Sequence, residues 1–193
     1  MRRVVITGVG AVTPIGNTVK EMWAGVREGK CGIDKITKYD ISNRKVKVAA
    51  EVKNLPVEEL VDKHDLRKMD LFCTFAMIAA DEAIADSGLS FEGEEDKCGV
   101  IVSSGIGGIS TIEKEYSKGL EKGFDRVSPY FIPSVITNMA AGRIAIKHNL
   151  QGMCSCVVTA CAGGTNAVGD SFRQIRDGYA DVMVCGGAEA GIT

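Results

Sequence analysis

The chain has 193 residues, of which 45% are hydrophobic, 25% charged and only 6% aromatic, and its formal net charge is −2. A charge this close to zero gives no overall field that would attract nucleic acid or an anionic membrane surface. The cysteines number 7, an odd count, and several lie in apolar runs without the spacing of a disulfide framework, which favours a reducing cytoplasm. No stretch reaches the roughly 18 apolar residues of a membrane span. We therefore expect a cytoplasmic domain with a packed α/β core.

The first predicted element is a buried strand over residues 3–9, where Val and Ile dominate. The Gly-Val-Gly run at 8–10 invites a dinucleotide-loop interpretation, but Thr13 stands where that loop needs its third glycine. We instead predict a tight turn into a helix over Val19–Glu28, which Gly29 ends. The glycine run is then a feature of packing.

The middle of the chain alternates between strand and helix patterns. An alternating stretch at 46–48 suggests an edge strand, and apolar residues at helical spacing predict a long helix over 67–87. A second buried strand is expected over 98–103, and it opens into a glycine-rich loop at 105–108. That loop lacks the Gly-Lys-Ser/Thr ending of a nucleotide loop, so close backbone packing or the wall of another kind of binding site is the better interpretation.

Two further segments precede the most informative stretch of the chain, which is 154–178, and one predicted strand follows it. Residues 117–127 look like a surface excursion, and 134–148 are predicted to form a helix. A last strand is expected over 182–185. Without an internal repeat or a long linker, the pattern predicts one domain of alternating β and α elements with a mainly parallel sheet.

Residues 154–178 change abruptly from a strand pattern to a helix pattern at Cys161. Val157 and Val158 favour an extended chain. After the cysteine, apolar residues recur on one helix face, at Val168, Phe172, Ile175 and Tyr179. The helix is therefore predicted to begin at or just after Cys161.

A thiol at that junction meets the free N–H groups and the positive dipole end of the first helical turn, which favour thiolate over thiol. Cys161 is thus a candidate nucleophile, although most free cysteines are simply small buried apolar residues. Gly163 and Gly164 each cost a helix about 1 kcal/mol relative to Ala. Their presence indicates that an acyl chain or neighbouring backbone approaches closely.

Several blocks of the sequence are more specific evidence than spacing alone. These are Val-Val-Ile-Thr-Gly-Val-Gly at 4–10, Arg-Lys-Met-Asp at 67–70, Ser-Gly-Ile-Gly-Gly at 104–108, Ser-Pro-Tyr-Phe-Ile-Pro at 128–133, and Thr-Ala-Cys-Ala-Gly-Gly-Thr-Asn-Ala at 159–167, followed by Cys-Gly-Gly-Ala-Glu at 185–189. Together they resemble the N-terminal half of elongating β-ketoacyl-acyl-carrier-protein synthases of the thiolase superfamily. The resemblance implies an α/β, thiolase-like fold, with a mainly parallel mixed sheet and helices on both faces. It covers 1–193 as one domain, and the C-terminal half of the family fold is expected to lie outside this chain.

The resemblance also implies a reaction. Cys161 would accept an acyl group from an acyl carrier protein and condense it with malonyl carrier protein, with loss of CO2 and no cofactor. In the family, two histidines, a lysine and an oxyanion-hole loop lie in the second half, so this chain alone is expected to be inactive. A thiolase-superfamily enzyme acting on coenzyme A or polyketide thioesters remains an alternative, as does a non-catalytic dimerisation or acyl-binding fragment.

Two more sets of site residues follow from the resemblance. The expected substrate-binding residues are Ile106, Gly107, Gly108, Ala162 and Gly163. Ile106 would bound the acyl pocket, or else anchor the loop in the core. The expected docking residues for the acidic carrier protein are Lys63, Arg67, Lys68 and Arg126, for which an ordinary solvated charge cluster is the plain alternative. A homodimer is also expected, in which the strand at 154–158 pairs with its twofold mate.

Other chemistry has weaker support in the sequence. His64 lies in a highly charged loop and His148 near a predicted helix C-terminus, so neither is a convincing catalytic base. A zinc tetrad of Cys154, Cys156, Cys161 and Cys185 has poor ligand spacing, because these residues sit in apolar runs and not in knuckle loops. No metal site is expected.

Overall fold

The computed structural model describes residues 2–193, and a parallel sheet of three strands in the order β4-β3-β5 forms their centre. Strand β3 (Cys98–Ser103) is buried along its whole length. It pairs with β5 (Val182–Gly187) from Cys98↔Val182 to Ser103↔Gly187, and with the short β4 (Cys154–Ser155) at Val100 and Ile101. Burial on both faces explains why β3 is a continuous apolar run.

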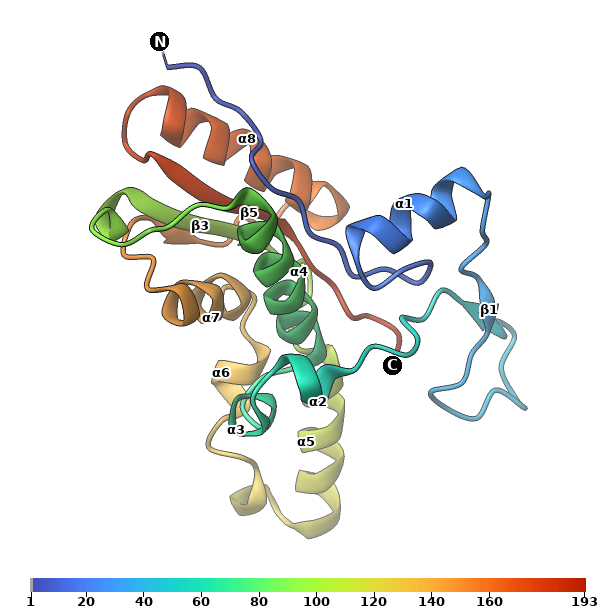
Figure 1. Ribbon diagram of the computed structural model, residues 1–193. Helices are drawn as coiled ribbons and strands as arrows, with labels where there is room; N and C mark the ends of the chain where they lie inside the picture. Colours follow the sequence, from blue (N-terminus) through green and yellow to red (C-terminus); the bar gives the residue numbers. More distant parts are fainter. Residues whose placement is uncertain (1) are drawn as a thin grey trace.

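Helices cover the two faces of this sheet (Figure 1). Helix α8 (Gly163–Arg176) packs on β3 and β5, while α7 (Met139–His148) packs on β3 and β4 from the other side. Helix α4 (Leu71–Ser87) lies against α7 and is buried nearly all round in its first half. The predicted α/β architecture, with a parallel sheet between helices, is confirmed.

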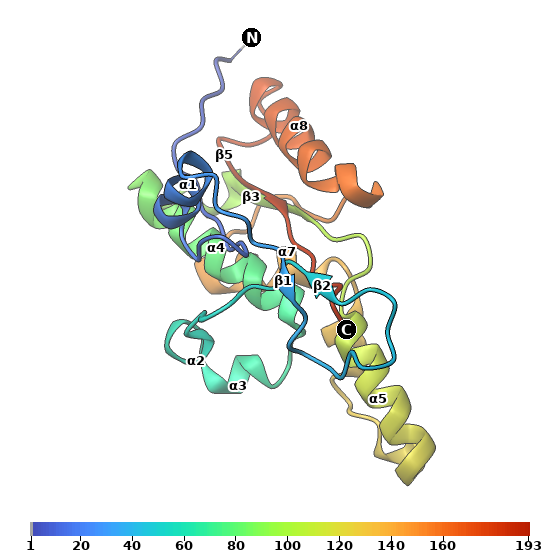
Figure 2. The same ribbon diagram turned by 90° about the vertical axis from the view of Figure 1, so that its right-hand side faces the viewer.

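The remaining elements surround this core. They are α1 (Val19–Arg27), β1 (Asp34–Lys35), β2 (Val48–Ala49), α2 (Val57–Leu60), α3 (Lys63–Leu66), η1 (Glu95–Lys97), α5 (Ile109–Lys122), η2 (Phe124–Arg126), α6 (Phe131–Val135) and η3 (Ala160–Ala162). Helix α1 begins after a Thr18 side-chain cap, and Gly29 at φ 67° follows its end, as predicted. Strand β2 pairs antiparallel with β1, close to the predicted edge strand. Figure 2 shows α5 extending away from the sheet, at the end of the molecule opposite the N-terminus.

The predicted strand over 3–9 is wrong. The segment runs outside the sheet, and it is held on α4 at its end: Val9 N donates to Asp86 Oδ2 at 3.0 Å, and just beyond the segment Ala11 N donates to Glu82 Oε2 at 2.9 Å. A Cβ on Gly10 would lie 1.8 Å from the carbonyl oxygen of Ala79. The glycine run therefore serves close approach to a helix backbone.

Four further predictions need correction, two of them helices. The helix predicted over 67–87 begins at Leu71, because Asp70 is extended and α3 ends just before Arg67. The helix predicted over 134–148 is two helices, α6 and α7, separated by the stretch 136–138. The surface excursion predicted over 117–127 is mostly the second half of α5, followed by the 3-10 turn η2. The strand expected over 154–158 is likewise ordered only at 154–155.

All seven cysteines are free thiols. Burial raises the pKa of Cys73 to about 12 and also raises that of Cys98, so both thiols stay protonated at neutral pH. Within the described residues, no helix combines the length and apolar character that a bilayer crossing requires. Over the same residues, no three His, Cys, Asp or Glu side chains lie close enough together to hold a metal ion.

Candidate active site

Cys161 lies at the beginning of a helix, as the sequence predicts. It is the central residue of the 3-10 turn η3, which leads directly into α8 at Gly163, and its side chain is exposed. The preceding residue, Ala160, has φ 48°, a left-handed conformation that costs a non-glycine residue about 1–2 kcal/mol. Such strain persists only where surrounding structure enforces it, and it concentrates at functional sites. An exposed thiol, a strained turn and a helix N-terminus thus coincide.

The glycines after Cys161 leave room for the ends of two strands: Gly163 for the Ser103 side chain, and Gly164 for the backbone of Gly187, one of the two explanations that the sequence left open. A Cβ on Gly163 would lie 1.9 Å from Ser103 Oγ and 2.8 Å from Ser103 Cβ. A Cβ on Gly187 would lie 3.0 Å from the Cα of Gly164. The first turn of α8 is therefore seated on the carboxyl ends of β3 and β5. The face of α8 that packs on the sheet consists of small buried residues, Gly163, Ala167 and Ser171, whereas the apolar residues Val168 and Phe172 remain about half exposed.

The loop after β3 lies beside this turn. A Cβ on Gly105 would be 3.9 Å from the Cα of Ala160. Gly107 has φ 72°, and a Cβ there would lie 2.2 Å from the carbonyl oxygen of Val135, so the loop packs backbone to backbone on α6. Ile106 is 55% exposed, which excludes the interpretation of its side chain as a core anchor within this chain. The start of the glycine-rich loop at Gly105 therefore lies beside the turn before Cys161, and its end at Gly107 packs on α6.

Two carboxylates that the sequence analysis assigned no role hold this loop. Glu189 accepts hydrogen bonds from Gly105 N at 2.8 Å and Ile106 N at 3.2 Å. The buried Asp70 accepts from Thr111 N at 2.8 Å and Thr111 Oγ1 at 2.7 Å, which caps the first turn of α5. Glu189 and Asp70 both belong to sequence blocks that carried the family resemblance. Glu189 is 84 residues from Gly105, and Asp70 is 41 residues from Thr111. No local pattern identifies such pairs.

The histidines lie outside this arrangement. His148 Nε2 lies 2.7 Å from Asp81 Oδ1, and Lys147 Nζ lies 2.6 Å from Asp81 Oδ2, which joins the end of α7 to α4. His64 contacts Lys68, with 2.6 Å between His64 Nε2 and Lys68 Nζ. Each histidine thus has a structural partner in its own neighbourhood.

The link between α7 and α4 predicts a pH-dependent contribution to stability. Burial alone would raise the pKa of Asp81, but the hydrogen bonds from His148 and Lys147 outweigh it and hold that pKa below its ordinary value. A lowered carboxyl pKa stabilises the fold above the pKa of the unfolded chain, and this contribution is lost as the pH falls through the folded pKa. We expect Asp81→Asn to lower the free energy of unfolding by about 1–2 kcal/mol at pH 7. Urea unfolding at several pH values checks this. The difference in free energy of unfolding between Asp81→Asn and the wild type should shrink below about pH 4. A difference that stays constant with pH would contradict the stabilising role of the ionised Asp81.

The expected docking residues are exposed or half-buried on neighbouring segments. Lys63 begins α3 and forms an exposed ion pair with Glu58 at 3.5 Å, and Arg67 is the C-cap residue directly after α3. Lys68 Nζ lies 5.1 Å from the centre of the Tyr130 ring, which links this region to the segment before α6, and Arg126 lies in η2 four residues earlier. Arg67 and Lys68 thus lie in the short connection between the C-terminus of α3 and the N-terminus of α4.

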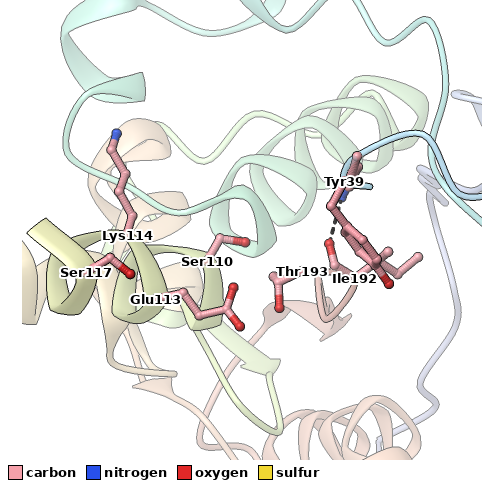
Figure 3. Close-up of a pocket in the computed structure, with 8 residues that line it drawn as sticks. Tyr39, Ser110, Glu113, Lys114, Ser117, Ile192 and Thr193 are labelled. Atoms are coloured by element: carbon pink, nitrogen blue, oxygen red, sulfur yellow. Dashed lines mark hydrogen bonds between the residues drawn. The ribbon is translucent and has the colours of Figure 1, made fainter. Parts of the chain in front are cut away.

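Two cavities lie apart from Cys161. A recess of about 460 Å³ is lined by polar residues of α5 together with Lys38, Tyr39, Ile192 and Thr193, and Lys38 Nζ donates to the Ile192 carbonyl at 3.4 Å (Figure 3). An apolar cavity of about 590 Å³ lies between the segment 4–10, α4, α8 and β5. None of the expected site residues lines the first cavity, and Cys161 lines neither.

Comparison with known proteins agrees with this arrangement. The chain matches the family described as "Beta-ketoacyl synthase, N-terminal domain" over residues 1–193. The "3-oxoacyl-[acyl-carrier-protein] synthase 2" of Synechocystis sp. is 45% identical over 193 residues, which are 100% of this chain and 46% of that protein. The protein of the same name from Staphylococcus aureus is also 45% identical over 193 residues, or 100% of this chain and 47% of that protein. The chain thus spans about half the length of the relatives it matches.

Solved structures show the same fold. The ishigamide ketosynthase/chain length factor superposes with a TM-score of 0.88 at 30% identity, over 98% of this chain and 48% of that chain. A β-ketoacyl synthase from Burkholderia phymatum superposes with a TM-score of 0.85 at 26% identity, over 99% of this chain and 48% of that chain. A ketosynthase in complex with its type II polyketide acyl-carrier protein reaches 0.81 at 24% identity, over 98% and 51% of the two chains, and supports the fold alone. Since the family match covers the whole of 1–193, the chain belongs to the β-ketoacyl synthase family and carries its N-terminal domain.

Proposed function

We propose that the protein carrying this chain is a 3-oxoacyl-acyl-carrier-protein synthase of fatty acid elongation, with Cys161 as the acyl-accepting nucleophile. The observation that carries the proposal is the exposed thiol at the N-terminus of α8, directly after the strained Ala160. A thiolate there attacks the carbonyl carbon of an acyl thioester, so that a new C–S bond forms and the carrier's thiolate leaves and takes up a proton. By resemblance, decarboxylated malonyl carrier protein then attacks the acyl-cysteine, and the groups that assist this step belong to the second half of the family fold.

The names of the relatives favour fatty acid over polyketide substrates. The relatives named 3-oxoacyl-acyl-carrier-protein synthase are 45% identical to this chain, whereas the ishigamide ketosynthase/chain length factor is 30% identical. Seven free cysteines also suit the reducing environment of the cytoplasm.

Mass spectrometry of the intact full-length protein tests the proposal. After incubation with an acyl thioester, we expect a mass increase of one acyl group that maps to Cys161 and is absent from Cys161→Ser. Cys31 is also exposed, so Cys31→Ser is the matched control and should be acylated like the wild type. Acylation of Cys31 and Cys161 at equal rates would indicate non-specific thiol chemistry and contradict the proposal.

We propose that Ile106 bounds the acyl pocket. Its exposed side chain stands in a loop that lies beside the Ala160 turn. In Ile106→Phe the larger ring should occupy part of the pocket, so the ratio of activity with a 16-carbon thioester to that with a 6-carbon thioester should fall by about 10-fold or more. Ile146→Phe, at a 75% exposed position on α7, is the control. An unchanged chain-length profile in Ile106→Phe would remove Ile106 from the pocket wall.

We propose that Lys63, Arg67, Lys68 and Arg126 dock the acidic carrier protein, a partner of the kind named for the polyketide ketosynthase above. With a net charge of −2, the chain needs a local basic patch for such a partner. The double variant Arg67→Glu/Lys68→Glu should slow association with carrier protein by about 10-fold at low salt and spare acyl transfer from a small neutral thioester. The control is Lys45→Glu/Lys47→Glu, an equal charge change in the exposed segment before β2. Equal losses with both substrates would show that the residues support folding instead.

We also propose a homodimer, for which the position of β4 is the support. This strand is at the edge of the sheet, and beyond it Val158 is 53% exposed. An edge strand of this kind offers unpaired backbone groups to a second copy of the chain. Sedimentation of the full-length protein as a monomer at micromolar concentration would contradict the proposal.

A further inference from the structure

Glu189 satisfies an otherwise open stretch of backbone in the loop beside Cys161. Its Oε2 accepts from Gly105 N at 2.8 Å and from Ile106 N at 3.2 Å, and its Oε1 accepts from Ser104 Oγ at 3.1 Å. Ser104 Oγ in turn accepts from Gly107 N at 3.0 Å. One carboxylate and one hydroxyl therefore bind three successive amides, 105 to 107, just where the backbone leaves the sheet.

The carboxylate reaches the loop from a rigid element. Glu189 follows β5, and the bond from Ala188 N to Ser103 O at 2.9 Å continues the pairing of β5 with β3 beyond the strand end. Hydrogen bonds from amides to an ionised acceptor are shorter and about twice as strong as those between neutral groups. The sheet thus fixes Glu189, and Glu189 fixes the loop.

The same carboxylate lies close to the nucleophile turn. A Cβ on Gly105 would be 3.0 Å from Glu189 Oε2 and 3.9 Å from the Cα of Ala160, so Gly105 is situated between the carboxylate and the residue before Cys161. Displacement of the loop by a fraction of an ångström would change the space beside Cys161 and the direction of the Ile106 side chain.

From this geometry we propose that Glu189 is a positioning residue: its carboxylate fixes the Gly105–Ile106 backbone beside the Ala160–Cys161 turn and thereby sets which acyl chains reach the thiol. The inference rests on the proposed acylation of Cys161. It assigns Glu189 no proton transfer and no contact with the reacting carbonyl. The residue acts through the loop.

The test compares acylation of Cys161 by a 16-carbon and a 4-carbon thioester in the full-length protein. Glu189→Gln keeps the size of the side chain but places an amide NH2 where a second acceptor oxygen stands. We expect it to slow acylation by the long thioester about 10-fold or more relative to the short one, since small misplacements at a reacting centre have effects of this order. Glu189→Asp, which keeps the charge but shortens the reach, should fall between wild type and Glu189→Gln. Glu92→Gln removes an equal charge from an exposed turn and should behave like the wild type.

The outcomes separate a positioning role from a merely structural one. Equal slowing with both thioesters together with a lower melting temperature would mean that Glu189 only stabilises the fold, and that result overturns the inference, as would wild-type selectivity in Glu189→Gln. If Glu189→Gln does not fold, Ser104→Ala removes the bridge between Glu189 and Gly107 and should show the same loss of long-chain selectivity; failure of both variants to fold also overturns the inference. Absence of acylation at Cys161 in the wild type would instead refute the proposed function itself.

Discussion

On the proposed function, replacement of Cys161 by serine should lower carbon–carbon bond formation by about 10³-fold or more, as removal of a covalent nucleophile does in other enzymes. A hydroxyl remains protonated at neutral pH unless a base activates it, and both histidines of this chain are engaged elsewhere, with Lys68 and with Asp81. Chromatography of the 3-oxoacyl product made by the full-length protein measures the effect. Cys31→Ser, at another exposed thiol, should retain full activity.

A second replacement at the same position distinguishes the two half-reactions. Cys161→Gln resembles an acyl-thioester in shape, so by family resemblance it is expected to retain malonyl decarboxylation while condensation is lost. Release of CO2 from malonyl carrier protein measures this. Retention of full elongation activity by Cys161→Ser would refute the mechanism outright.

Gly163→Ala is expected to lower the free energy of unfolding by about 2 kcal/mol, even though alanine is the better helix former. The new methyl would lie 2.8 Å from Ser103 Cβ, and rotation of the Ser103 hydroxyl cannot relieve that contact. The first turn of α8 would have to rise from β3, and Cys161 would move with it. Urea unfolding of the full-length protein measures the change.

The control lies in the same helix. A Cβ on Gly169 would meet nothing within 4 Å, so Gly169→Ala should stabilise the protein by about 0.5–1 kcal/mol through helix propensity alone. Opposite signs for the two substitutions would identify the β3 contact as the cause. A gain in stability in both variants would show that the turn can shift without cost.

Local patterns were sufficient for part of this structure. The run that forms β3 is apolar because both of its faces are covered, and the change of pattern at Cys161 marks a real boundary between extended chain and helix. The limits of α1 follow from Thr18, whose side chain caps its first turn, and from Gly29, whose left-handed backbone follows its C-cap. In each of these cases the residues that determine the element lie within it or next to it.

The errors have long-range causes. The apolar segment 3–9 has the composition of a strand, yet Val9 N at its end bonds to Asp86 on α4 and Ala11 N just beyond it bonds to Glu82, which no local pattern reveals. The error over 117–127 has a different origin, because helix α5 does carry a local signal. Apolar residues recur at helical spacing, at Ile109, Ile112, Tyr116 and Leu120, although Tyr116 and Leu120 are 59% and 64% exposed. The break after α6 follows from packing, because the Val135 carbonyl accepts a hydrogen bond from Gly108 in the loop beside the site.

The two carboxylates that hold the 104–111 segment also constrain the order in which the site can fold. The bonds to Thr111 span 41 residues and those to Gly105 span 84, so both belong to the non-local contacts that slow folding. At a synthesis rate of about 5–20 residues per second, Gly105 leaves the ribosome roughly 4–17 s before Glu189 does. During that interval the amides of the loop are without their acceptor, and the turn that carries Cys161 is made in the same period. The loop at 105–107 and the turn that carries Cys161 should therefore be among the last parts of this domain to become resistant to protease on the ribosome, after β3 and α4 have been made.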